Sequence, residues 1–161
     1  LAIPSKLLWI GVGSTMKVST RGRYGVNAAF ELAIRCGEGP IPIKVIADAQ
    51  QLSESYLEQL MAKLRKAGIV NSARGAQGGY ELTRHPGEIT VGEVLYAVEG
   101  PMVPADCLLQ NGRRGCIRKE TCAGRIIWGK IYDGIRSVID TMTLADLIEE
   151  KERIERLEDN G

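Results

Sequence analysis

The stretch from residue 43 to residue 67 constrains the fold more than any other part of the chain. Ile43 to Gln50 is expected to form a helix of about two turns, and Ser53 to Ala67 a longer one that starts at Ser53 as N-cap and ends before Gly68. The longer helix is expected to bury Leu57, Leu60, Met61 and Leu64. Two helices joined by so short a turn form a helix-turn-helix.

An amphipathic helix is predicted to precede this pair. Between Ser19 and Cys36, the residues Tyr24, Ala28, Leu32 and Ala33 recur at helical spacing, and Gly37 stops the pattern. We expect this first helix to be well buried, with Cys36 as a small core residue beside its apolar stripe.

A β-hairpin is predicted after the helix-turn-helix. Residues 69–73 and 80–82 are expected to be strands, and the Gly-rich residues 74–79 the tight loop between them. Thr90 and Glu93 form a capping box that opens a helix through Val98, and Gly100-Pro101 then breaks the chain. The fold class predicted is therefore mainly α with a small β-wing, in a winged helix-turn-helix domain over residues 16–100.

Charge is distributed unevenly along a chain whose net charge is only +1. Residues 16–85 carry ten Lys/Arg and six Asp/Glu, whereas residues 126–161 carry five and nine. The basic front half is the one expected to face phosphates. No apolar run approaches the ~20 residues that span a bilayer, and nothing resembles a signal peptide, so we expect a cytoplasmic protein. Residues 1–15 are expected to be a vector-derived leader.

Side chains suited to reading nucleic acid occupy the predicted outer face of residues 53–67. Gln addresses adenine edges, Ser is a donor and acceptor, Glu accepts from cytosine, and Lys neutralises phosphate. Arg74, at the base of the predicted wing, is placed to enter a narrow minor groove. The alternative is that these are ordinary solvated residues of a helix and a surface hairpin. The outer face is expected to present Ser55, Glu58, Gln59, Ala62, Lys63 and Lys66.

Three of the four cysteines lie within one Gly- and Arg-rich stretch, residues 101–125, which we expect to be a metal-binding or redox loop. Eight residues separate Cys107 from Cys116, and five separate Cys116 from Cys122. Neighbouring arginines and lysines favour thiolates over thiols. Cysteines with this spacing can also be oxidised or bind zinc. Zinc sites usually contain a Cys-x-x-Cys pair, however, and this stretch has none.

The remaining segment, residues 126–161, is expected to mediate dimerisation. Apolar residues follow one seam of a long helix from Arg125 to Met142, and the small N-terminal domain could hardly cover that seam alone. A twofold dimer would present two recognition helices to successive major grooves of a pseudo-palindromic operator. Thr143 and Asp146 then open an acidic helix, whose apolar residues are expected to pack back on the dimer. The seam consists of Ile127, Ile131, Ile135, Val138 and Met142, and the last helix supplies Leu144, Leu147, Ile148 and Ile154.

Three long motifs closely resemble the IscR/NsrR/CymR family of winged-helix bacterial transcription regulators. They are STRGRYGVNAAFELA, SESYLEQLMAKLRKAGIVNSARGAQGGYEL and TVGEVLYAVEG, in the family's order. By this resemblance, Ser55, Tyr56, Glu58 and Gln59 lie on a recognition helix, and Arg65, Ser72 and Arg74 match contacts to the DNA backbone and minor groove. Tyr56 is equally suited to packing at the helix start. The full predicted DNA-binding set is Lys17, Ser19, Ser53, Ser55, Tyr56, Glu58, Gln59, Lys63, Arg65, Lys66, Ser72, Arg74 and Gly75.

The same resemblance assigns Cys107, Cys116 and Cys122 as ligands of an iron–sulfur cluster of the [2Fe–2S] type, as in the IscR branch of the family. That branch places a His three residues after the last Cys, where this chain has Arg125. A guanidinium cannot ligate iron, so the fourth ligand is left open. Candidates are Glu120, Glu58, Asp48, Cys36, His85 and a residue of a partner subunit.

These observations predict a homodimeric, iron–sulfur-sensing transcription regulator that controls cluster-biogenesis genes. One alternative keeps the DNA binding but makes the cysteines a thiol redox switch or a zinc site. Another is a small redox enzyme or cluster carrier. The sequence shows no acid–base pair beside a nucleophile and no phosphate-binding Gly loop, so an enzyme is not expected.

Overall fold

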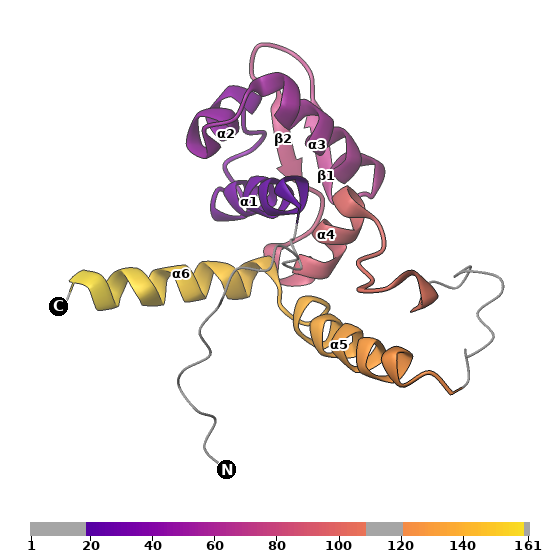
Figure 1. Ribbon diagram of the computed structural model, residues 1–161. Coiled ribbons are helices and arrows are strands. Elements are labelled where there is room, and N and C mark those ends of the chain that lie inside the picture. The colour runs from indigo at the N-terminus through magenta and orange to yellow at the C-terminus, as the bar shows by residue number, and fades with distance from the viewer. Residues whose placement is uncertain (1–18, 109–120, 160–161) are drawn as a thin grey trace.

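The computed structural model describes residues 19–108 and 121–159, and in them six α-helices accompany one two-stranded sheet (Figure 1). This confirms the predicted mainly helical fold with a small β-wing. The elements are α1 (Thr20–Ile34), α2 (Ile43–Gln50), α3 (Glu54–Lys66), β1 (Val70–Ala73), β2 (Gly79–Leu82), η1 (Pro86–Glu88), α4 (Val91–Glu99), η2 (Asp106–Leu108), α5 (Ala123–Ile139) and α6 (Leu144–Asp159).

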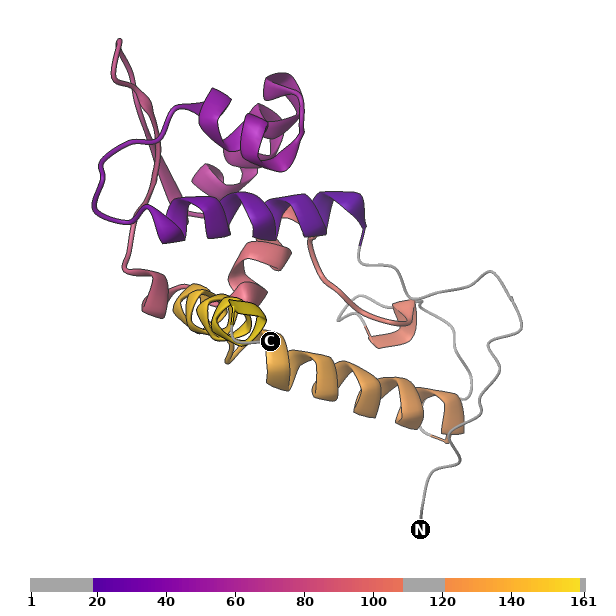
Figure 2. The ribbon, with the colours of Figure 1, turned by 90° about the vertical axis from the view of Figure 1, so that its left-hand side faces the viewer.

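Helix α1 lies at the centre of the core, between the α2–α3 pair and α4 (Figures 1 and 2). Its small residues permit this position: Ala28 and Ala29 are fully buried, and Gly25 lies directly against Val98 of α4. Cys36 does not join the core, contrary to the sequence-based expectation. Helix α1 ends at Ile34, so Cys36 falls in the following turn and is exposed.

The helix-turn-helix has the predicted geometry. Gln51 adopts a left-handed conformation with φ of 53°, which reverses the chain after α2. Ser53 then caps α3 by accepting a hydrogen bond from the Tyr56 N–H at 3.3 Å. The four apolar residues predicted to be buried in this helix, from Leu57 to Leu64, are all at most 2% exposed.

The wing is an antiparallel hairpin in which Val70 pairs with Leu82 and Ala73 with Gly79. Gly75, with φ of 109°, supplies the backbone conformation that turns the loop. Tyr80 also exchanges backbone hydrogen bonds of 2.8 and 2.9 Å with Ile41, which anchors β2 to the segment before α2. The tip, residues 74–77, is exposed.

Helix α4 begins with the predicted capping box between Thr90 and Glu93. Burial tends to raise the pKa of the Glu93 carboxyl. Hydrogen bonds from Thr90 and an ion pair with Arg84 at 2.7 Å outweigh that effect, and the pKa lies below its usual value. The carboxylate therefore remains charged and holds the start of α4 in place.

The start of α6 belongs to the core of the same chain. Thr143 and Asp146 form the expected cap, and Leu144 is fully buried. Leu147 and Ile148 pack against the same core, whereas Ile154 is 48% exposed. The prediction that these residues pack on a dimer is thus wrong for Leu144, because a bridge between Thr90 and Thr143 draws it against Ile89.

Helix α5 makes few contacts with the rest of the chain and contains no buried residue. Its C-terminal end meets α4, where the Tyr96 hydroxyl donates to the Asp140 carboxylate at 2.8 Å. Burial and this hydrogen bond raise the pKa of the Tyr96 hydroxyl. In both views the rest of α5 extends away from the core (Figures 1 and 2). None of the helices in the described part of the chain has the length and apolarity to cross a membrane.

The contact between α1 and α4 yields a first test. A Cβ added at Gly25 would lie 2.9 Å from Val98 Cγ2. We expect Gly25→Ala to lower the free energy of unfolding by about 1–2 kcal/mol, because overpacking costs about 1–3 kcal/mol and helix propensity returns up to about 1 kcal/mol. Urea unfolding followed by circular dichroism measures this change.

The matched control is Val98→Ala, alone and combined with Gly25→Ala. The double variant should lose less stability than the sum of the two single variants, since the added methyl enters the space that Val98 vacates. Strict additivity of the two losses would contradict the proposed contact.

Candidate nucleic-acid interface and cysteine site

The outward face of α3 presents a row of polar side chains. Ser55, Glu58, Gln59 and Lys66 are exposed, and Lys63 is half-buried. The opposite face of the helix is locked into the core, so these side chains are carried on a rigid support. Such a face has the mixture of hydrogen-bonding and cationic groups that DNA grooves require.

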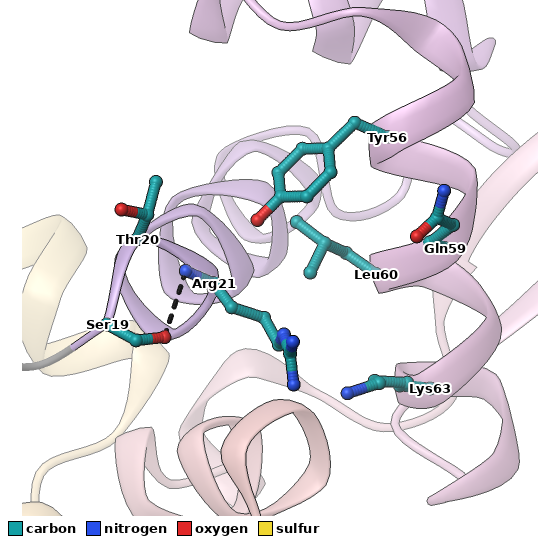
Figure 3. A pocket seen from close by; sticks show the side chains of 7 residues that line it. All are labelled: Ser19, Thr20, Arg21, Tyr56, Gln59, Leu60 and Lys63. Carbon is teal, nitrogen blue, oxygen red and sulfur yellow. Dashed lines mark hydrogen bonds between the residues drawn. The ribbon is translucent and has the colours of Figure 1, made fainter.

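Tyr56 packs at the start of α3, which is one of the two roles considered for it. Its ring is half-buried and meets the Tyr24 ring edge-on, with centroids 6.1 Å apart. Its hydroxyl end lines a cavity between α1 and α3 (Figure 3). The ring therefore fastens the start of α3 to α1 and leaves a polar group at the surface.

The end of α3 is tied to the wing by one hydrogen bond. Arg65 Nη1 donates to Ser72 Oγ at 3.0 Å, and both residues are exposed. Arg74 and Gly75 follow on the exposed loop. The structure thus joins the end of α3 to the wing, which follows it directly in the sequence.

A cavity of about 330 Å³, which we call the α1–α3 cavity, opens beside the outward face of α3. Lys63 reaches across it, and its Nζ donates to the Val98 carbonyl oxygen at 2.8 Å. Thr20 and Arg21 were not among the predicted DNA-binding residues, because nothing in the spacing of residues 19–21 indicates that α3 lies opposite. The lining residues are Ser19, Thr20, Arg21, Tyr56, Gln59, Leu60 and Lys63 (Figure 3).

Ser19 is the N-cap of α1. Its Oγ accepts a hydrogen bond from the Arg21 N–H at 3.2 Å and also donates to the Glu99 carboxylate. Glu99 in turn accepts from the Gly22 N–H at 2.6 Å. Of the predicted DNA-binding residues, Lys17 lies outside the described residues.

Two of the three loop cysteines are on neighbouring elements. Cys107 belongs to η2, which packs against α5, and Cys122 is the N-cap residue of α5. Both are half-buried free thiols, and the Cys122 side chain makes no capping hydrogen bond. Cys116 and Glu120 lie outside the described residues. Within the described part of the chain, no three His, Cys, Asp or Glu side chains gather closely enough to hold a metal ion.

The other candidates for a fourth ligand are dispersed. Asp48 and Glu58 are exposed on α2 and α3, and α4 lies between these helices and α5 (Figure 1). Cys36 follows the C-terminal end of α1, which is the end that lies away from η2 (Figure 2). The His85 ring caps η1, where its Nδ1 accepts from the Gly87 N–H at 3.1 Å. Arg125 occupies the first turn of α5 and cannot ligate iron.

Helix α5 exposes a large apolar surface. Ile127 is 51% exposed and Val138 54%, and both lie on the seam recognised in the sequence. Ile131 and Ile135 on the same seam are only half-buried. Apolar side chains repeated along a helix and left uncovered within one chain are typical of a contact surface.

Comparisons with known proteins agree with this geometry. The family model for Rrf2, an iron-dependent transcriptional regulator, matches residues 18–150. The HTH-type transcriptional regulator CymR of Bacillus subtilis is 46% identical over 132 residues, which are 82% of this chain and 89% of CymR.

The HTH-type transcriptional regulator IscR of Aliivibrio salmonicida is 40% identical over 137 residues, 85% of this chain and 80% of IscR. Among solved structures, that of CymR (YrzC), the global cysteine regulator of B. subtilis, superposes with a TM-score of 0.70 at 43% identity. That match covers 84% of this chain and 98% of CymR.

Proposed function

The chain belongs to the Rrf2 family of DNA-binding transcriptional regulators, and we propose that it acts as a homodimer whose DNA binding responds to an iron–sulfur cluster. Its relatives are regulators and not enzymes. In this proposal α3 and the wing read DNA, α5 pairs with its copy, and Cys107, Cys116 and Cys122 hold a cluster of the [2Fe–2S] type. The regulated genes would be those of cluster biogenesis.

One observation carries the DNA-reading part of the proposal: the outward face of α3 and the wing form a continuous polar surface joined by the Arg65–Ser72 hydrogen bond. Ser55 and Gln59 would address base edges, while Arg65 and Lys66 would meet phosphates. Glu58 would accept from cytosine and repel other acceptors, which favours some operators over others. Arg74 would enter the minor groove.

The dimer is supported by the exposed seam of α5. A single chain leaves Ile127 and Val138 about half exposed, and pairing with a second copy would remove them from water. Because α5 is attached to α4 through Tyr96 and Asp140, a twofold α5 pair would set the spacing between two α3 helices. A pseudo-palindromic operator follows from that symmetry.

The chemistry of the donor set supports a cluster. Cys107 and Cys122 are unpaired thiols on elements that touch, and soft thiolate ligands select iron–sulfur clusters. Cys122 begins α5, and the N–H groups of a helix start favour the negative charge of a thiolate-ligated cluster. When bound, the cluster supplies a redox-active group that oxidation or iron shortage removes.

Helix α4 offers a route from the cysteines to the DNA-reading surface. The last residues of α4 directly precede the cysteine segment. They also contact α3 and the start of α1: the Val98 carbonyl oxygen accepts a hydrogen bond from Lys63, and the Glu99 carboxylate accepts hydrogen bonds from Ser19 and Gly22. A change in the backbone after Gly100 would therefore move groups beside α3. Cluster binding would alter DNA affinity only if the cluster-bound and cluster-free forms differ in these contacts.

A second candidate keeps the DNA binding but uses the cysteines as a thiol redox switch or zinc site. It is favoured by the 46% identity to CymR, whose B. subtilis structure is that of a global cysteine regulator. Exposed and half-buried thiols such as Cys36 and Cys107 are open to oxidation. Metal content separates the two candidates.

The DNA-reading proposal is tested with Gln59→Ala on an operator selected by the wild-type protein from random duplexes. We expect the selected operator to contain inverted half-sites. The substitution should weaken operator binding by about 1–3 kcal/mol and non-specific binding much less, because Gln59 would read a base edge. Fluorescence anisotropy measures both affinities. Glu149→Gln, on exposed α6, should leave them unchanged, and equal losses on both duplexes for Gln59→Ala would contradict base reading.

The dimer is tested by sedimentation velocity. Val138→Asp would bury a carboxylate in an apolar contact, so we expect the dimer to weaken at least about 30-fold, or about 2 kcal/mol. Ser137→Asp places the same group one residue away, off the seam, and should remain dimeric. A wild-type monomer at micromolar concentration, or equal effects of the two substitutions, would exclude α5 pairing through this seam.

The cluster is tested by anaerobic purification followed by a visible spectrum and assays for iron, acid-labile sulfide and zinc. We expect iron and sulfide in equal amounts, lost in Cys116→Ala and retained in the control Cys36→Ala. Zinc without sulfide would establish the zinc site. A metal-free protein that forms a disulfide on oxidation would establish the thiol switch.

A further inference from the structure

We propose that the α1–α3 cavity is a seat for one backbone phosphate of double-stranded DNA, held by Arg21 and Lys63. This inference rests on the proposed DNA-binding function and adds Arg21, on the first turn of α1, to the surface formed by α3 and the wing. A phosphate contact does not distinguish one base sequence from another. Its effect would be to fix the position of α3 in the DNA groove.

The cavity brings two cations together from separate helices. Arg21 comes from α1 and Lys63 from α3, and their charged ends point toward one another across the opening (Figure 3). Two like charges held this way repel each other in the free protein. A phosphate between them would convert that repulsion into two attractions.

The Arg21 guanidinium has no partner among the described residues. Its backbone N–H bonds to Ser19, but no hydrogen bond, ion pair or ring contact engages its side chain, which is exposed. Within residues 19–108 and 121–159, Lys63 is held only by the Val98 carbonyl oxygen, a neutral acceptor. The positive charge at this opening is thus available to an external anion.

The one acidic group described at this end of α1 is already engaged. The Glu99 carboxylate accepts from the Gly22 N–H and the Ser19 hydroxyl, which ties α4 to the start of α1. The Arg21 and Gly22 N–H groups of α1 are therefore occupied, and the anion would be bound by side chains. The Tyr56 hydroxyl points into the same opening and can donate to phosphate oxygens (Figure 3).

The position of the cavity favours DNA phosphate over a free anion. Gln59 lines the cavity and also belongs to the outward face of α3, so an occupant would lie next to any base edge that Gln59 reads. In helix-turn-helix complexes the strand bordering the major groove passes beside the recognition helix. The Arg21 side chain, at the start of α1, is then placed to contact a phosphate of that strand.

The test is the salt dependence of DNA binding by the full chain, measured by fluorescence anisotropy with a labelled duplex of non-specific sequence. Each neutralised phosphate contributes about 0.9 to the slope of log affinity against log salt concentration. Arg21→Gln should lower the slope by about that amount. The affinity ratio of wild type to variant should then fall about 3.5-fold from about 50 to about 200 mM KCl.

Two further variants complete the design. Arg21→Lys keeps the charge and should keep the wild-type slope. Arg23→Gln removes a charge two residues away, where the guanidinium stacks on the Tyr24 ring at 5.9 Å and lines a different cavity, and should leave the slope unchanged. Because the Arg21 side chain is exposed, the thermal unfolding of Arg21→Gln should match that of the wild type.

The inference is overturned if wild-type protein binds DNA and Arg21→Gln shows the same slope, or if Arg23→Gln lowers it equally. Absence of any DNA binding by the wild type at low salt would overturn the proposed function, and this site with it. The two failures are therefore distinguishable.

Discussion

The close contact between α1 and α4 is the interaction on which the rest of the structure depends. Glycine at position 25 lets the Val98 side chain lie against the α1 backbone, and this approach places the end of α4 against both α1 and α3. From there the Val98 carbonyl oxygen accepts from Lys63, and Glu99 binds the start of α1. A looser contact would separate α3 from its support and the cysteine segment from both.

The apolar core leaves the polar groups that could bind DNA on the surface of the protein. No polar or charged residue is buried in the described part of the chain, so the charged groups of α1, α3 and the wing are all at the surface or near it. Apolar packing gives α3 a fixed orientation, and the exposed groups on its other face carry the chemistry. Rigid support for a polar surface reduces the conformational entropy lost when a partner binds.

Helix α5 carries an uncovered apolar seam next to two free cysteines. Ile127 and Val138 on the seam are about half exposed, and Cys107 and Cys122 are half-buried free thiols. Both features lie at the junction that follows α4, where Tyr96 and Asp140 fasten α5 to the winged-helix domain. Pairing of α5 and occupancy of the cysteines would thus act on the same helix that contacts α3, which makes α4 the natural element for coupling them.

Local patterns in the sequence determined most of the secondary structure. The short turn at Gln51 and Leu52, the caps at Ser53, Thr90 and Thr143, and the glycines of the wing each depend on interactions between near neighbours, which can be recognised without a fold. Tertiary structure alone decided that Cys36 is exposed, that Leu144 enters the core, and that Arg21 faces Lys63 across a cavity. These three depend on where helices end and which surfaces meet. Such contacts join residues far apart in the chain, and helical periodicity shows that a face is apolar without showing what covers it.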